Sequence, residues 1–120
     1  MRRSLAVLLV AGVLVVGPGL AIAHSLLLAS SPEADAVVPA PPSRVSLRFN
    51  NRIEKTLSRI RLVDGHGARR DLAVASGDDP PDLVSAAVPR LDAGPYRVEW
   101  QVLSTDGHIV SGRFSFRVAP

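Results

Sequence analysis

The chain of 120 residues contains no cysteine, and its one methionine is the initiator Met1. The missing thiols exclude a disulfide framework and a thiolate metal site. The missing thioether sulfur removes the soft donor that would select Cu(I). Any metal bound by the folded chain must therefore be held by nitrogen and oxygen atoms.

Aromatic residues and one-sided charge are also scarce. Only 4% of the residues are aromatic, and 14 basic residues stand against 11 acidic ones, a formal net charge of +3. The basic residues between positions 44 and 70 are interleaved with apolar residues rather than clustered with stacking aromatics. This distribution is typical of solvated strand faces and not of a nucleic-acid surface. We therefore expect no nucleic-acid partner.

The first residues have the pattern of a secretory leader. Two arginines at residues 2–3 precede an apolar run at residues 5–16, a glycine-proline-glycine break, and the small residues Ala21 and Ala23. These are the positive, apolar and cleavage regions of a signal peptide. The pattern predicts cleavage after Ala23.

A retained membrane anchor is the alternative interpretation of the leader. An anchor needs about 20 apolar residues to cross the hydrocarbon core, and the glycine-proline break leaves a shorter run. The paired arginines fit both the general secretory and the twin-arginine route, so the route stays open. We divide the chain into a signal peptide, residues 1–23, and a domain, residues 24–120, exported to the periplasm or another extracytoplasmic part of the cell envelope.

The exported domain of 97 residues is long enough for one modest core. Short runs of alternating apolar residues recur between turn signals, and no apolar stripe of period 3.6 predicts a helix. About seven strands are predicted, at residues 25–30, 45–49, 57–63, 70–74, 83–88, 96–103 and 113–118, with residues 104–111 as the last connection. This spacing favours an all-β antiparallel sandwich with Greek-key connections.

Cleavage after Ala23 would leave His24 as the first residue of the mature chain. A free α-amine and the imidazole Nδ1 of the same residue can close a chelate ring on one cation. An internal histidine cannot do this, because its backbone nitrogen is an amide. His24 is therefore a candidate metal ligand.

The other two histidines occur in the same tripeptide, Asp-Gly-His, at residues 64–66 and 106–108. Turn chemistry alone explains the first, so His66 is expected to be an exposed turn residue. Asp106 and His108 fit a turn equally well, but they can also aim a carboxylate oxygen and an imidazole nitrogen at one point. With His24 they would form a set of three nitrogens and one oxygen, which suits tetragonal Cu(II). Zinc remains chemically possible, although its tetrahedral preference fits this chelate less well.

Four segments carry more specific patterns. They are the histidine start at residues 24–32, the strand and turn at residues 45–51, a Tyr-x-Val-x-Trp run at residues 94–100, and a Ser-x-Asp-x-His run followed by Ser-Gly at residues 104–112. Together they resemble the CopC family of exported copper-binding proteins. The resemblance covers the whole mature domain.

The resemblance implies an immunoglobulin-like β-sandwich or barrel that binds one Cu(II) near one end through His24, Asp106 and His108. Some members of the family add a carboxylate after the second strand, where this chain has Asn51, and a methionine-rich Cu(I) site, for which it has no residues. The implied task is copper sequestration, resistance or delivery to a membrane copper transporter of the CopD-like type. A monomer or weak oligomer is expected.

Two other functions compete with this interpretation. An N-terminal histidine with a second histidine on copper also forms the brace of oxidative polysaccharide-cleaving enzymes, but Tyr96 and Trp100 are expected in the core, which leaves no aromatic substrate platform. The third possibility is a metal-free immunoglobulin-like interaction module in which the histidines are incidental. We expect a binding protein, not an enzyme.

Overall fold

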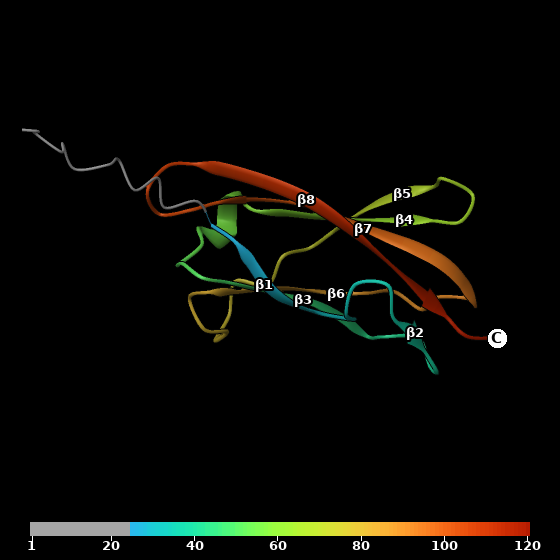
Figure 1. Ribbon diagram of the computed structural model, residues 1–120. Coiled ribbons are helices and arrows are strands. Elements are labelled where there is room, and N and C mark those ends of the chain that lie inside the picture. Colours follow the sequence, from blue (N-terminus) through green and yellow to red (C-terminus); the bar gives the residue numbers. More distant parts are fainter. Residues whose placement is uncertain (1–24) are drawn as a thin grey trace, which may run out of the picture.

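The computed structural model describes residues 25–120, and these form a two-layer β-sandwich (Figure 1). The predicted leader and His24 lie outside the described residues. One sheet has the strand order β1-β3-β6, and the other has the order β2-β8-β7-β4-β5. The strands are β1 (Leu27–Ser31), β2 (Val37–Val38), β3 (Arg44–Phe49), β4 (Arg59–Asp64), β5 (Arg69–Leu72), β6 (Leu83–Ala87), β7 (Gly94–Leu103) and β8 (Ile109–Val118). The predicted all-β sandwich is confirmed.

Helical structure in the described part is limited to the short 3-10 helix η1 (Lys55–Leu57). No helix within residues 25–120 has the length and apolar character needed to span a membrane.

Alternation of side chains determines which face of each strand enters the core. In β7, Val98, Trp100 and Val102 are buried, while Gln101 between two of them is exposed. The same period of two operates in β8, where Phe114, Phe116 and Val118 are buried between exposed polar residues. The predicted strand faces are therefore confirmed.

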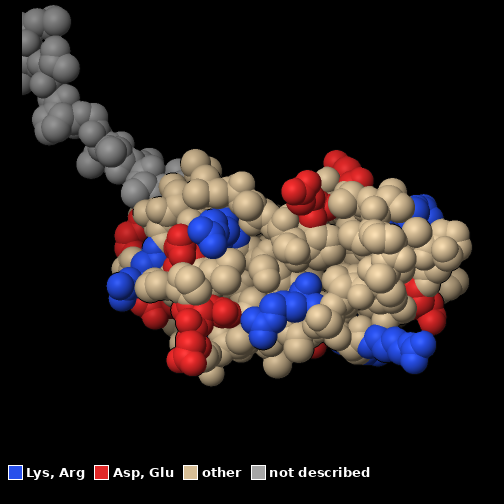
Figure 2. Space-filling view, turned by 90° about the horizontal axis from the view of Figure 1, so that it is seen from below, with Lys and Arg blue, Asp and Glu red and all other residues tan. Residues whose placement is uncertain are grey.

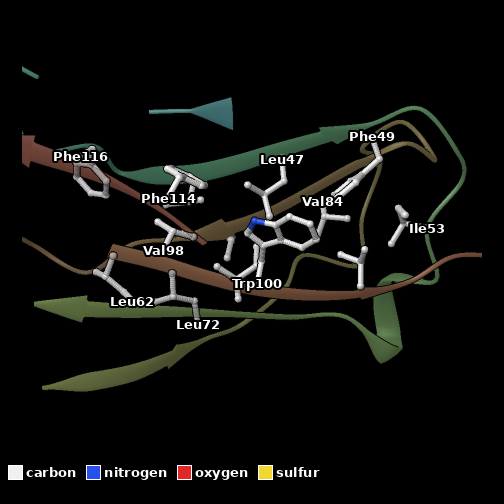
Figure 3. Packing of buried hydrophobic residues seen from close by; sticks show 14 of the residues in the cluster. Leu47, Phe49, Ile53, Leu62, Leu72, Val84, Val98, Trp100, Phe114 and Phe116 are labelled. Atoms are coloured by element: carbon white, nitrogen blue, oxygen red, sulfur yellow. The ribbon is translucent and has the colours of Figure 1, made fainter. Parts of the chain in front are cut away.

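The core lies between the two sheets and contains most of the aromatic rings (Figure 3). Phe49 of β3 meets Trp100 of β7 edge to face, with ring centroids 5.2 Å apart and planes at 72°. Tyr96 stacks on Phe116 with centroids 5.6 Å apart. The first contact joins the two sheets and helps to fix how they pack, whereas the second joins neighbouring strands of one sheet.

The last two strands are longer and more tightly joined than the sequence predicted. Strand β8 begins at Ile109, so the connection from β7 spans residues 104–108 and not residues 104–111. The short strand β2, which pairs in parallel with β8, was not predicted, because two valines beside a proline-rich stretch give no alternation.

The predicted boundaries placed Gly112 between the last connection and the last strand, and this is wrong. It lies inside β8 opposite Trp100, and a Cβ atom built there would come within 2.4 Å of the indole Cζ2. The tryptophan ring packs into the space that any larger side chain at this position would occupy.

We expect Gly112→Ala to lower the free energy of unfolding by about 1–3 kcal/mol, the usual cost of overpacking a well-filled core. Urea denaturation followed by tryptophan fluorescence would measure it. Gly77→Ala is the matched control, because a Cβ there meets nothing within 4 Å. Equal stability of the two variants would show that the indole has room to move.

Candidate metal centre

Asp106 and His108 lie in the tight connection between β7 and β8, at the end of the sandwich where β1 begins (Figure 1). The backbone N–H of Ser104 donates to the carbonyl of His108 at 3.0 Å, and the N–H of Gly107 donates to the carbonyl of Ser104 at 2.9 Å. Gly107 has a φ of 89°, in the left-handed region that favours glycine. The turn therefore determines the spacing of the two candidate ligands.

The carboxylate of Asp106 is held by donors of its own loop. Its Oδ1 accepts a hydrogen bond from the buried hydroxyl of Ser104 and another from the backbone N–H of His108 at 3.1 Å. These hydrogen bonds, that of Ser104 foremost, lower the pKa of Asp106 to about 2. The group is therefore an ionised oxygen donor at neutral pH.

The imidazole of His108 lies against this carboxylate. Its Nδ1 is 3.2 Å from Oδ2 of Asp106, and the two side chains are 56% and 37% exposed, respectively. Two ligands about 2.0 Å from one metal ion are themselves about 2.8 to 3.3 Å apart in right-angled or tetrahedral geometry. The pair thus has the spacing of two ligands of one ion while remaining open to solvent.

The second Asp-Gly-His tripeptide provides an internal comparison. Oδ1 of Asp64 accepts from the N–H of His66 at 2.8 Å and from the N–H of Ala68 at 2.9 Å, and His66 is exposed in the turn between β4 and β5. Within residues 25–120, no contact joins the imidazole of His66 to a carboxylate. The prediction that His66 is an exposed turn residue is confirmed.

One short segment connects the loop to the start of the described chain. The side chain of Asn50 accepts a hydrogen bond from the N–H of Leu26 at 2.7 Å, and its backbone N–H donates to the Leu26 carbonyl at 3.1 Å. Two residues later, the carbonyl of Arg52 accepts from the N–H of Thr105 at 3.4 Å. Two residues span at most about 7 Å, so Leu26 and the 104–108 loop are bonded to positions of the same segment that lie close together.

Ser104 holds the loop and Asn50 holds the start of the described chain, and neither contact was predicted from the sequence. Ser104 could have been found from its place two residues before Asp106, where a hydroxyl often bonds a neighbouring polar group. The role of Asn50 depends on the pairing of β1 with β3, which the sequence does not show. Asn51, where some family members have a carboxylate, is half-buried and offers an amide.

The described residues alone do not form the predicted metal site. Within residues 25–120, no three side chains of His, Asp or Glu come together. Asp106 and His108 therefore give two donors, and further donors must come from water or from His24, which lies outside the described residues.

Comparison with known proteins gives one family match and several related copper proteins. Residues 27–119 match the family description "CopC domain". Copper resistance protein C of Pseudomonas syringae pv. tomato is 32% identical over 98% of this chain and 96% of its own length. Copper transport protein CutJ of Bacillus subtilis is 28% identical over 84% of this chain but only 19% of its own length.

Solved structures with the same fold are also similar in sequence. The crystal structure of CopC from Methylosinus trichosporium OB3b has a TM-score of 0.76 and 38% identity, covering 81% of this chain and 95% of that one. PcoC, a methionine-rich copper resistance protein from Escherichia coli, has a TM-score of 0.67 and 34% identity, covering 80% and 99%. This chain differs from PcoC in having no methionine after Met1.

Proposed function

Because the chain belongs to the CopC domain family, we propose that it is an exported copper-binding protein that holds one Cu(II) ion through His24, Asp106 and His108. Signal cleavage after Ala23 creates the α-amine, which binds the metal together with the imidazole of the same residue. The single observation that carries the proposal is the 3.2 Å approach of the His108 imidazole to the Asp106 carboxylate in an exposed loop.

The position of the chain start supports the inclusion of His24. His24 precedes Leu26 by two residues, which span at most about 7 Å, and Leu26 is fixed to Asn50 by two hydrogen bonds. Ser25, the residue between them, is buried. After cleavage, a short and anchored connection of this kind would hold the amine within reach of the loop and limit the entropy lost when the chelate closes.

The donor types determine the oxidation state that the site favours. Three nitrogens and a carboxylate oxygen suit Cu(II), whereas Cu(I) prefers the thiolate and thioether sulfur that this chain lacks. We therefore assign the chain a single Cu(II) site and no methionine site.

Asp106 can act in two ways, and one variant distinguishes them. Either Oδ2 binds the metal, or it accepts a hydrogen bond from Nδ1 of His108 and directs Nε2 to the metal. We expect Asp106→Asn to shift the electron paramagnetic resonance parameters of bound Cu(II), because a direct ligand changes the charge of the donor set. Unchanged parameters with affinity weakened about 10- to 100-fold would instead assign Asp106 the orienting role.

Copper affinity is expected to fall steeply as the pH decreases. Free α-amines and imidazoles take up protons near pH 8 and pH 6.5, and each proton that the metal must displace lowers affinity about tenfold per pH unit. Asp106, with its pKa of about 2, stays ionised and adds no slope in this range. In competition titrations at several pH values, the logarithm of the copper affinity should therefore fall by about three per pH unit below pH 6. A decrease that begins only below pH 4 would mean that carboxylates alone hold the metal.

The proposed task is sequestration or delivery of exported copper. Relatives named copper resistance proteins match most of this chain, and in CutJ a segment similar to this chain forms part of a much longer copper transport protein. A CopD-like membrane transporter is the proposed acceptor. Turnover is not needed, and Trp100 is buried in the core, so it provides no platform for a polysaccharide.

One experiment tests export and coordination together. The N-terminus of secreted protein is mapped by mass spectrometry, and the same sample is titrated with Cu(II) and examined by electron paramagnetic resonance. We expect a chain that begins at His24, one equivalent of copper, and hyperfine coupling from nitrogen donors. A chain that begins elsewhere and still binds copper with the same spectrum would contradict the role of the α-amine.

A further inference from the structure

The outer face of the five-stranded sheet carries a concentration of arginines. Since alternate residues of β4, β7 and β8 enter the core, those between them point outward, and the residues of β5 that pair with the outward positions of β4 share their side. We name this surface the arginine face; its charged residues are Arg59, Arg61, Arg69, Asp71, Arg97, Glu99, Arg113 and Arg117. Six arginines thus stand against two carboxylates.

This face differs in charge from the rest of the molecule. The described chain has 12 basic and 11 acidic residues, so the arginine face carries about +4 and the remainder about −3. Figure 2 shows the opposite side, around β1, β3 and β6, where basic and acidic side chains are mixed. The charge separation orients the molecule in front of an anionic surface.

Most of the arginines keep their donors available. Arg61 donates to Asp71 at 2.9 Å, while Arg97 only approaches Glu99, at 3.9 Å. Within the described chain, Arg59, Arg69, Arg113 and Arg117 have no ion pair. Their guanidinium groups can therefore form paired hydrogen bonds to another oxyanion.

The centre of the arginine face is hollowed. A depression of about 380 Å³ is lined by Arg59, Arg61 and Arg113, with Gln101 and Ser111 between them, and also by the carboxylates of Asp71 and Glu99. The strand register supports this arrangement, because Gln101 of β7 pairs with Arg59 on one side and Ser111 on the other. A phosphate group fits the fork of a guanidinium better than it fits an ammonium group.

Exposed apolar side chains lie at both ends of the arginine face. Ile109, at the start of β8, and Val37, which pairs with Arg117 at its end, are each 65% exposed. A surface with arginines in the middle and apolar groups at its ends matches a membrane interface, where the basic groups meet headgroups and the apolar ones enter between them. An acidic protein surface would satisfy the arginines but not these side chains.

We propose that the arginine face docks on the phosphate headgroups of an anionic lipid surface. Ile109 directly follows the 104–108 loop, so docking places the candidate metal centre at the edge of the membrane contact. This surface needs no copper, and the inference does not depend on the identity of the metal ligands.

The test uses metal-free mature protein and two kinds of vesicle. Sedimentation is compared for vesicles of equal parts phosphatidylglycerol and phosphatidylcholine and for vesicles of phosphatidylcholine alone. We expect binding to the anionic vesicles only, and a decrease in binding as salt is added. Equal binding to both kinds, or to neither, would overturn the proposal.

Matched variants locate the contact. Arg113→Gln should weaken binding to the anionic vesicles about fivefold, and Arg59→Gln with Arg113→Gln about 25-fold, because each arginine near such a surface contributes about that factor. Arg48→Gln, an exposed residue of β3 on the other sheet, removes the same charge and should change binding less than twofold. An equal loss for Arg48→Gln would mean that net charge, not this face, drives binding.

Two competitors identify the ligand. Inorganic phosphate at millimolar concentration should not displace the protein from vesicles; displacement would assign the depression to free phosphate. Polyglutamate that binds more tightly than the vesicles, and does so through Arg59 and Arg113, would assign the face to an acidic protein and overturn the lipid proposal. Copper affinity of Arg113→Gln should equal that of the unaltered protein, since Arg113 lies five residues beyond the loop.

Discussion

Replacement of His108 by alanine is expected to weaken Cu(II) binding by at least about 100-fold. Changes to groups that only orient a metal ligand cost about 10- to 100-fold, so loss of a ligand itself should reach or exceed that range. In this variant Asp106 would still offer a carboxylate oxygen to the metal, but the coordination position proposed for the imidazole would have no protein ligand. Competition with a chromophoric chelator at neutral pH measures the change.

The chain contains its own control for this experiment. His66→Ala removes a histidine from the same tripeptide in a turn of the same kind, but no carboxylate lies against its imidazole in the described residues. Copper affinity should stay within about twofold. If both variants lost affinity equally, surface histidines would be binding copper without a built site.

The two tripeptides also show what sequence could and could not predict. A turn was expected at residues 64–66 and was one of two interpretations at residues 106–108, and both segments form turns, because aspartate and glycine favour the required backbone. The difference between them arises from the adjacent residues and strand ends: Ser104 is buried at the end of β7 and bonds to the Asp106 carboxylate. Local sequence therefore predicted the turns and the possible pairing of Asp106 with His108, but not the hydrogen bond from Ser104 that holds the carboxylate.

Alternation predicted most of the fold for a similar reason. The inward set of Tyr96, Val98, Trp100 and Val102 could be read directly, since a period of two needs no knowledge of other strands. Gly112 and Asn50 could not be interpreted in this way. Gly112 is required by the indole opposite it and Asn50 by the backbone of β1, and both contacts depend on strand register.

The arginines illustrate the same limit. Along the sequence they are interleaved with apolar residues, which correctly argued against a continuous basic segment. Strand pairing then brings Arg61, Glu99 and Arg113 side by side from three strands. A charged face thus results from the register of the paired strands, although no run of basic residues in the sequence predicts it.

Addition of one glycine before His24 in the mature chain is expected to weaken Cu(II) binding by about 100-fold or more. The extension changes the α-amine of His24 into an amide and moves the free amine to the added glycine, so the chelate of the proposed site is lost, while both histidine side chains and Asp106 remain. The electron paramagnetic resonance parameters of bound Cu(II) should change at the same time. Calorimetric or competition titration of the two forms measures the loss.

The same extension should leave the fold unchanged, which separates lost coordination from lost structure. Ser25 is buried and Leu26 is bonded to Asn50, so β1 is held by residues that the extra glycine does not replace. A glycine added after Pro120 is the matched control, and both extended chains should unfold at the temperature of the mature protein. If the N-terminally extended chain bound copper with undiminished affinity, the α-amine of His24 would be excluded as a ligand. Copper would then be bound by side chains alone.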